Sequence, residues 1–168
     1  MEFLERAMTA QELGAGGIMA APGLLGLSII RELSSAPDFH LPIFLHPCFS
    51  GPLVLSADSG VSPFCYYGQF SRLAGADAAI FTSFGGRFPF TEEVCRKICD
   101  GTETEMGGLR SIFPVPSGGM KWQLFKKMVQ VYGPDAIFLV GGALLTESDD
   151  LTANMHFYFE KLNEAVNK

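Results

Sequence analysis

Apolar residues along the chain gather in short runs that alternate with longer amphipathic segments. Five of these runs are apolar on both faces, and Gly, Pro or Ser follows each within two residues. Such runs are typical of buried parallel strands. The pattern therefore predicts strands at residues 17–21, 41–45, 78–82, 112–115 and 136–140.

The segments between the runs have apolar residues at helical spacing. We expect helices at residues 1–13, 24–33, 64–73, 91–99, 121–132 and 151–166. Asp149 and Asp150 directly precede the last of these and are predicted to cap its first turn. One helix followed by five strand–helix units is typical of an α/β fold with parallel strands and right-handed crossovers.

The pattern alone fits two architectures for one domain spanning residues 1–168. An open doubly wound sheet of five strands would be complete at this length, whereas a (β/α)8 barrel typically needs about 250 residues. Length therefore favours the open sheet. In either architecture the functional residues lie just beyond the carboxyl ends of the strands.

Composition narrows the expected partners and location. The chain is 48% hydrophobic and carries a formal charge of −6, which argues against nucleic acid or an anionic membrane as the main partner. No apolar run reaches the roughly 18 residues of a membrane span. The N-terminus is acidic and amphipathic, which is not typical of a signal or transit peptide, so we expect a cytoplasmic protein.

The four cysteines do not follow a metal-binding pattern. Cys95 and Cys99 are spaced C-x3-C on an expected helix, while Cys48 and Cys65 stand alone. A zinc site needs four well-placed ligands, or three and a water. We therefore expect no metal ligands here, and reduced thiols that pack as small hydrophobic side chains.

Adjacent glycines follow the last two expected strands, as Ser117-Gly118-Gly119 and as Gly141-Gly142. Glycine lets backbone N–H groups approach an oxygen-rich ligand closely, and a helix that begins just after it adds a favourable dipole. One such pair is usually only a turn, but two on consecutive strands favour a phosphate site. Neither GxGxxG nor GxxxxGK[ST] occurs, which argues against dinucleotide and nucleoside-triphosphate binding.

Two further residues could carry chemistry at this edge. His46 ends the second run and could act as a general acid or base, although its spacing fits a hydrogen-bonded core histidine equally well. Arg87 follows Gly85-Gly86 and could close over an anionic ligand, or it could be an ordinary solvated arginine.

Five sequence segments, read in order, resemble the carboxyl-terminal barrel of the RuBisCO large-chain superfamily, especially the RuBisCO-like proteins. They are GAGGIMAAPG, LPIFLHPCFSG, LAGADAAIFTSFGGRF, PVPSGGM and IFLVGGALL. The resemblance covers nearly the whole chain, and PSGGM together with GAD-x7-GG is its most specific part. It implies a partial TIM (β/α)8 barrel of about five βα units, strands four to eight, in place of the open sheet.

The resemblance also implies roles for the strand ends. The glycines of the two pairs would bind a substrate phosphate, with Ser117 meeting a substrate hydroxyl. His46 aligns with the catalytic histidine of the family, and Arg87 with the lysine of a flexible lid loop. Because guanidinium is not a compact ammonium, the role of Arg87 does not carry over directly.

Two positions depart from the carboxylases of this family. Pro47 and Ile80 stand where the second phosphate site uses an arginine and a histidine, and neither can bind an anion. A monophosphate is therefore expected in place of a bisphosphate, and CO2 fixation is not expected. The resemblance then implies an enolase or isomerase of methionine salvage, acting on a compound such as 2,3-diketo-5-methylthiopentyl-1-phosphate.

The magnesium site of the family, a carbamylated lysine with two acidic residues, has no counterpart here, because no K-x-D-D/E motif precedes Gly14. We expect no cofactor in these 168 residues and Mg²⁺ in full-length members. The first three barrel strands and the N-terminal domain have no counterpart either. One hypothesis is the phosphate-binding half of an enolase or isomerase, completed by a homodimer or by a chain with the other strands. The alternative is an inactive truncated relative that serves as a binding or assembly module.

Overall fold

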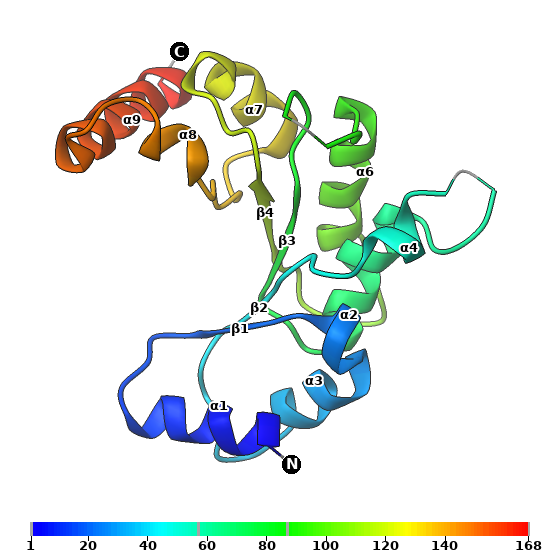
Figure 1. Cartoon of the computed structure of the whole chain (residues 1–168). Helices are drawn as coiled ribbons and strands as arrows, with labels where there is room; N and C mark the ends of the chain where they lie inside the picture. The colour runs from blue at the N-terminus through cyan, green and yellow to red at the C-terminus, as the bar shows by residue number, and fades with distance from the viewer. Residues whose placement is uncertain (1, 57, 87, 168) are drawn as a thin grey trace.

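The centre of the molecule is a parallel sheet whose strands follow one another in chain order (Figure 1). The computed structural model describes residues 2–56, 58–86 and 88–167, so Arg87 lies outside the described residues. The strands of the sheet, neighbours in the order given, are β1 (Ile18–Ala20), β2 (Ile43–Leu45), β3 (Ala78–Thr82) and β4 (Phe113–Ser117). Chain order is typical of a barrel segment, and the doubly wound order that length alone favoured is wrong.

The fifth apolar run lies beside β4 but pairs with it only through a parallel bridge between Ser117 and Leu139. The amide of Ile137 donates to the carbonyl of Pro114 at 3.0 Å. The amide of Leu139 donates to the carbonyl of Pro116 at 3.1 Å. Both prolines accept but have no N–H to donate in return, so only part of a ladder can form. The fifth expected strand is therefore reduced to a bridge.

Helices connect the strands, and in the described residues none is both long and apolar enough to span a membrane. They are α1 (Glu2–Glu12), α2 (Pro22–Leu25), α3 (Leu27–Ser34), α4 (Gly51–Val54), the π-helix η1 (Phe64–Phe70), α5 (Ser71–Leu73), α6 (Glu92–Glu103), the 3₁₀ helix η2 (Trp122–Leu124), α7 (Phe125–Tyr132), α8 (Gly142–Leu145) and α9 (Leu151–Val166).

The helical pattern read from the sequence is confirmed, with local differences. Gly26, at φ 81°, separates α2 from α3 within one expected helix. The segment after residue 63 begins as a π-helix, and the short helices α4 and α8 were not expected. The predicted cap is confirmed for Asp150, whose side chain accepts the Ala153 amide at 2.9 Å.

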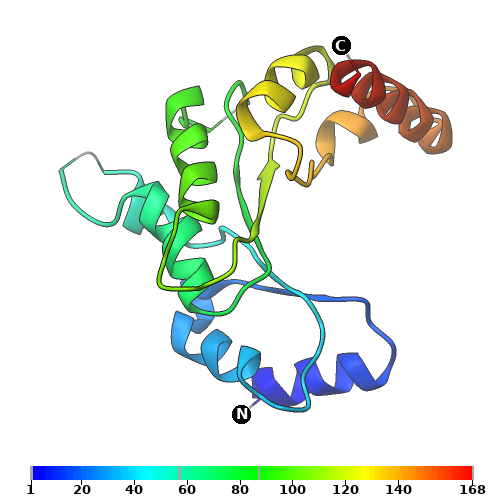
Figure 2. The same ribbon diagram turned by 180° about the vertical axis from the view of Figure 1, so that it is seen from behind.

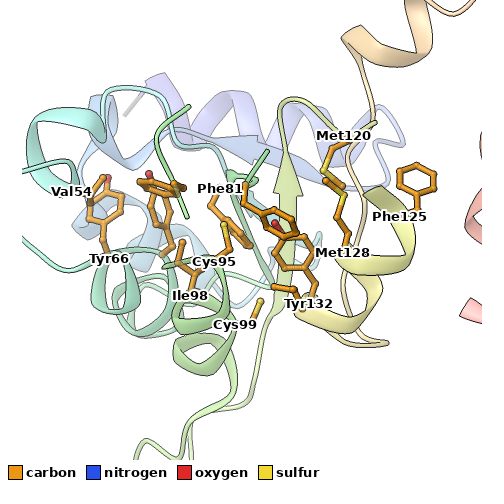
Figure 3. Packing of buried hydrophobic residues seen from close by; sticks show 14 of the residues in the cluster. Val54, Tyr66, Phe81, Cys95, Ile98, Cys99, Met120, Phe125, Met128 and Tyr132 are labelled. Atoms are coloured by element: carbon orange, nitrogen blue, oxygen red, sulfur yellow. The ribbon is translucent and has the colours of Figure 1, made fainter. Parts of the chain in front are cut away.

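The helices bury one face of the sheet in two clusters. In the larger cluster, Phe81 of β3 packs against Tyr132 of α7, with ring centroids 5.9 Å apart (Figure 3). The ring of Tyr67 on η1 lies 6.3 Å from that of Phe81. Cys95 and Cys99 of α6 are buried in the same cluster. The smaller cluster joins α1 and α3 to β1 and β2.

The opposite face of the sheet is partly uncovered. Side chains alternate between the faces of a strand, and the strand pairing places Met19, Phe44, Ala78 and Phe113 in one row. Met19 is 57% exposed and Phe113 is 49% exposed at the two ends of this row, whereas Ala78 between them is 1% exposed and belongs to a small buried cluster. Figures 1 and 2 show α1 and α8 at the two ends of an arc, with this face between them. The arrangement is that of a partial TIM barrel.

Candidate functional site

The residues predicted to carry chemistry lie at the carboxyl edge of the sheet. His46 directly follows β2, and Gly118 directly follows β4. Gly141 comes two residues after Leu139, which pairs in parallel with Ser117. Because parallel strands end at the same edge, the two glycine turns leave the sheet side by side.

The turn at Gly118 and Gly119 needs glycine for reasons within the chain. Both residues have left-handed backbone conformations, with φ of 73° and 79°. A Cβ on Gly119 would lie 2.4 Å from the Cα of Gly86, and one on Gly118 would lie 3.2 Å from the ring of Phe88. The segment after β3 therefore packs directly on this turn, and larger residues would separate the two.

Gly141 and Gly142 differ from that pair. Gly141 has a φ of −128°, and neither glycine adopts the left-handed region. A Cβ on either residue would meet no atom of the described chain within 4 Å. Internal packing therefore does not require these two glycines, and the space beside them is open to a ligand.

Ser117 closes β4 and is held from two sides. Its Oγ donates to the carbonyl of Phe81 at 3.0 Å, and its own carbonyl accepts the amide of Ser83 at 2.7 Å. The hydroxyl proton is thus committed to the neighbouring strand. The lone pairs of Oγ remain able to accept a hydrogen bond from a ligand hydroxyl.

His46 is exposed at the edge, so the interpretation as a core histidine is wrong. Its Nδ1 accepts a hydrogen bond from the amide of Cys48 at 3.2 Å. An accepting Nδ1 carries no proton, so in the neutral ring the proton lies on Nε2. His46 can therefore donate a hydrogen bond from Nε2 to a carbonyl oxygen of a ligand.

A pocket of about 280 Å³, which we call the edge pocket, opens beside His46. Thr82 at the end of β3, Val54 and Leu55 at the end of α4, and Phe90 after β3 contribute to its walls. The sequence did not predict it, because its walls come from three separate segments and α4 is too short to recognise. The aromatic residues that follow Gly85-Gly86 in the sequence could have indicated an apolar pocket at this edge.

The floor of the edge pocket holds a buried pair of hydroxyls. Ser50 donates its proton to the carbonyl of Pro47 at 2.6 Å, so the phenol of Tyr67 donates to Ser50 at 2.7 Å. Burial raises the pKa of Tyr67. The phenol therefore stays protonated near neutral pH and holds the segment after His46 in place.

The described residues contain no group of three or more His, Cys, Asp or Glu side chains that could hold a metal ion. The four cysteines are free thiols, and Cys95 and Cys99 are buried. Burial raises the pKa of Cys99 to about 12, so this thiol stays neutral. The expectation that these cysteines pack as hydrophobic side chains is confirmed for the two on α6.

No protein-family model matches the chain. The sequence is 36% identical over 155 residues to 5-methylthioribulose-1-phosphate isomerase of Rhodospirillum rubrum, covering 90% of this chain and 38% of that protein. It is 32% identical over 155 residues to 2,3-diketo-5-methylthiopentyl-1-phosphate enolase of Exiguobacterium sibiricum, covering 92% of this chain and 39% of that protein. The chain thus spans less than half the length of these curated relatives.

Solved structures with the same fold cover nearly the whole chain. A rubisco-like protein from Alicyclobacillus acidocaldarius matches with a TM-score of 0.87 at 28% identity, over 98% of this chain and 44% of that chain. The octameric ribulose-1,5-bisphosphate carboxylase/oxygenase of Pyrococcus horikoshii matches with a TM-score of 0.85 over 98% of this chain and 39% of that chain. Its identity of 20% supports a common fold alone.

Proposed function

The chain belongs to the RuBisCO superfamily as a carboxyl-terminal barrel portion, and from this premise we propose that it forms the phosphate-binding half of a methionine-salvage enolase or isomerase. The named activities of its relatives support this assignment. The proposed substrate is a sugar-like monophosphate of the 2,3-diketo-5-methylthiopentyl-1-phosphate type. CO2 fixation is not part of the proposal, because Pro47 and Ile80 offer no second anion site.

The observation that carries the proposal is the pair of glycine turns at one edge. Backbone N–H groups of these turns, Ser117–Gly119 and Gly141–Gly142, would converge on one phosphate, and we call this arrangement the glycine cradle. The open space at Gly141 and Gly142 supports it, since internal packing leaves their lack of side chains unexplained. Arg87, which comes five residues after Thr82 in the sequence, would add a cation.

His46 would act on the part of the substrate beyond the phosphate. Enolisation moves a proton from carbon to a carbonyl oxygen, and a hydrogen bond to that oxygen stabilises the charge that develops on it. The Nε2–H of His46 provides such a donor at the same edge as the cradle. The group that removes the carbon-bound proton would come from outside these described residues.

The remainder of the barrel would come from another polypeptide segment, either through a homodimer or through a chain that carries the other strands. Magnesium, which the family implies, would have to be bound there, because the described residues contain no fitting cluster of ligands. The same finding supports the second candidate function. In that case the chain binds a phosphorylated ligand or assembles with relatives without catalysing a reaction.

Calorimetric titration with inorganic phosphate tests the cradle directly. Gly142→Val should weaken binding by about 10- to 150-fold, which corresponds to the loss of one charge-assisted hydrogen bond of about 1.5–3 kcal/mol. Gly16→Val is the matched control, because Gly16 also has open space around it and lies far from the site in sequence. If the parent chain takes up no phosphate, or if Gly142→Val binds it equally well, the two glycine pairs are only turns.

A further inference from the structure

We propose that a cavity at the amino edge of the sheet binds a doubly charged oxyanion such as phosphate. The cavity lies at the start of β3 and β4, because Asp77 and Ile112, which line it, directly precede these strands. His46 and the glycine cradle lie at the opposite, carboxyl edge. This anion site is therefore separate from the candidate functional site, and the inference does not rest on the proposed function.

Three arginines from separate segments line this space, which we call the amino-edge cavity. Arg31 comes from α3, Arg72 from α5 and Arg110 from the segment before β4. Asp77 is the only acidic side chain among the described residues of its lining. Three positive charges and one negative charge give a formal charge of +2, although the whole chain carries −6. A doubly charged anion would balance this local excess.

Arg72 holds a positive charge inside the protein without a carboxylate partner. It is 3% exposed, and within the described residues no ion pair involves it. Its guanidinium donates instead to backbone carbonyls, from Nε to Arg110 at 2.9 Å, from Nη2 to Leu109 at 2.7 Å, and from Nη1 to Gly101 and Thr104. Carbonyl groups are dipoles, so they satisfy hydrogen bonds without neutralising the charge. An anion in the cavity would supply the counter-charge.

The cavity also offers hydrogen-bond donors to such a ligand. A guanidinium has five N–H groups, and the bonds to carbonyls use four of those of Arg72. The fifth, on Nη2, makes no bond within the described chain. Ser111 also lines the cavity, and its hydroxyl can donate to the same ligand. Hydrogen bonds between a guanidinium and an oxyanion are among the strongest in proteins.

The carboxylate of Asp77 does not pair with these arginines. Its Oδ2 accepts the amide of Ile43 at 2.9 Å, which directs it toward β2. Arg31 donates to the carbonyl of Leu73 at 3.4 Å, and in the described part of the chain neither Arg31 nor Arg110 forms an ion pair. Three like charges around one cavity repel one another, and a bound anion would relieve that repulsion.

The amino-edge cavity has room for such an ion. Its volume is about 340 Å³, and a water molecule takes up about 30 Å³ of the liquid. A tetrahedral oxyanion and several waters would therefore fit together. Guanidinium groups bind phosphate through two parallel N–H···O bonds, a geometry that a halide ion does not match. The expected occupant is therefore an oxyanion, either a free ion or the phosphate group of a small ester.

Calorimetric titration of the Gly142→Val chain with inorganic phosphate tests this site, because that variant weakens the glycine cradle. Arg31→Gln and Arg110→Gln should each weaken the remaining phosphate binding by about 10- to 150-fold, through the loss of one charge-assisted hydrogen bond. Both residues are exposed, and Arg110→Gln keeps the carbonyl that Arg72 uses, so the fold should be retained. Arg6→Gln is the matched control, because Arg6 is an exposed arginine on α1 that does not line the cavity.

Three further measurements define the ligand. Asp77→Asn should tighten phosphate binding severalfold, because it removes a negative charge beside the anion. Acetate, which carries one charge, should bind at least about tenfold more weakly than phosphate. The ratio of methyl phosphate binding to phosphate binding distinguishes an ester from a free ion.

The outcomes separate this site from the glycine cradle. If the Gly142→Val chain binds no phosphate, if Arg31→Gln and Arg110→Gln leave its binding unchanged, or if acetate binds as tightly as phosphate, the proposed site is wrong. If the arginine variants lose phosphate and Gly142→Val alone changes nothing, the amino-edge site is supported and the cradle fails.

Discussion

Replacing Gly119 by alanine should destabilise the fold, whereas the same change at Gly142 should not. The two glycines belong to neighbouring turns and would both contact the proposed phosphate. They differ in their surroundings within the chain. Gly119 has a φ of 79° and lies against the backbone of Gly86, while Gly142 has open space beside it.

The expected cost at Gly119 has two parts. A residue with a Cβ in the left-handed region costs about 1–2 kcal/mol. The new Cβ would also lie 2.4 Å from the Cα of Gly86, which is backbone and cannot rotate away. Forcing such a contact apart typically costs about 1–3 kcal/mol. The sum is about 2–5 kcal/mol of unfolding free energy.

The two reference variants should behave differently. Gly118→Ala carries the same conformational cost, but its Cβ would lie 3.2 Å from the side chain of Phe88, which can shift. We expect about 1–2 kcal/mol there. Gly142→Ala should change the unfolding free energy by less than about 0.5 kcal/mol, or raise it slightly, because alanine favours the first turn of a helix.

Urea unfolding, followed by circular dichroism and by the fluorescence of the single tryptophan Trp122, measures these differences. The order of midpoints should be Gly142→Ala, then Gly118→Ala, then Gly119→Ala as the lowest. Equal midpoints for the Gly119 and Gly142 variants would refute the close packing between the segment after β3 and the turn after β4. The same data show which glycines can be changed to probe a ligand without disturbing the fold.

Three further predictions follow from other parts of the molecule. Arg72 is buried and donates to four backbone carbonyls within residues 101–110. Arg72→Met should therefore lower the unfolding free energy by about 3 kcal/mol or more. Urea unfolding measures this loss, with Arg31→Met as the control. Burial raises the pKa of the Cys99 thiol from its ordinary value near 9 to about 12 in the folded state. The stabilisation from the neutral thiol is complete below pH 9 and is lost as the pH rises from 9 toward 12. The unfolding free energy should therefore fall over this range, and less steeply in Cys99→Ala. The exposed apolar residues of the sheet face should drive association, so sedimentation should show a dimer or a larger species. Phe113→Gln should weaken this association, and a stable monomer at high concentration would contradict the prediction.

The sequence predicted those elements whose signal is local. The bounds of β3 and α9 agree with the expected ranges to the residue, because an uninterrupted apolar run and an aspartate cap mark them. The fifth run has an equally strong apolar pattern but forms only a bridge. Its pairing depends on Pro114 and Pro116 of the neighbouring strand, and no property of residues 136–140 reveals that.

The candidate site also has features that the sequence predicts and features that only the fold reveals. The position of His46 and the glycine pairs at one edge was predictable, because parallel strands bring their carboxyl ends together. Their roles stay predictions. The contact between Gly86 and Gly119 was not, although both stand in Gly-Gly pairs, because it joins two turns that are distant in sequence. The edge pocket was missed for the same reason, since Val54, Tyr67 and Phe90 meet only in the folded chain.

The open face of the sheet and the open edge of the site have a common cause. The row that contains Met19 and Phe113 faces the side where a closed barrel would place its other strands, and Leu139 beyond β4 is also 40% exposed. His46 and the glycine cradle border that same side at the carboxyl edge. If parallel strands of another segment cover the apolar row, their ends lie opposite His46, where the base and metal ligands that the proposed function requires would have to stand. In that case, the assembly that buries the face would also complete the proposed reaction. A partner that covers the face without supplying those groups would produce a stable but inactive protein.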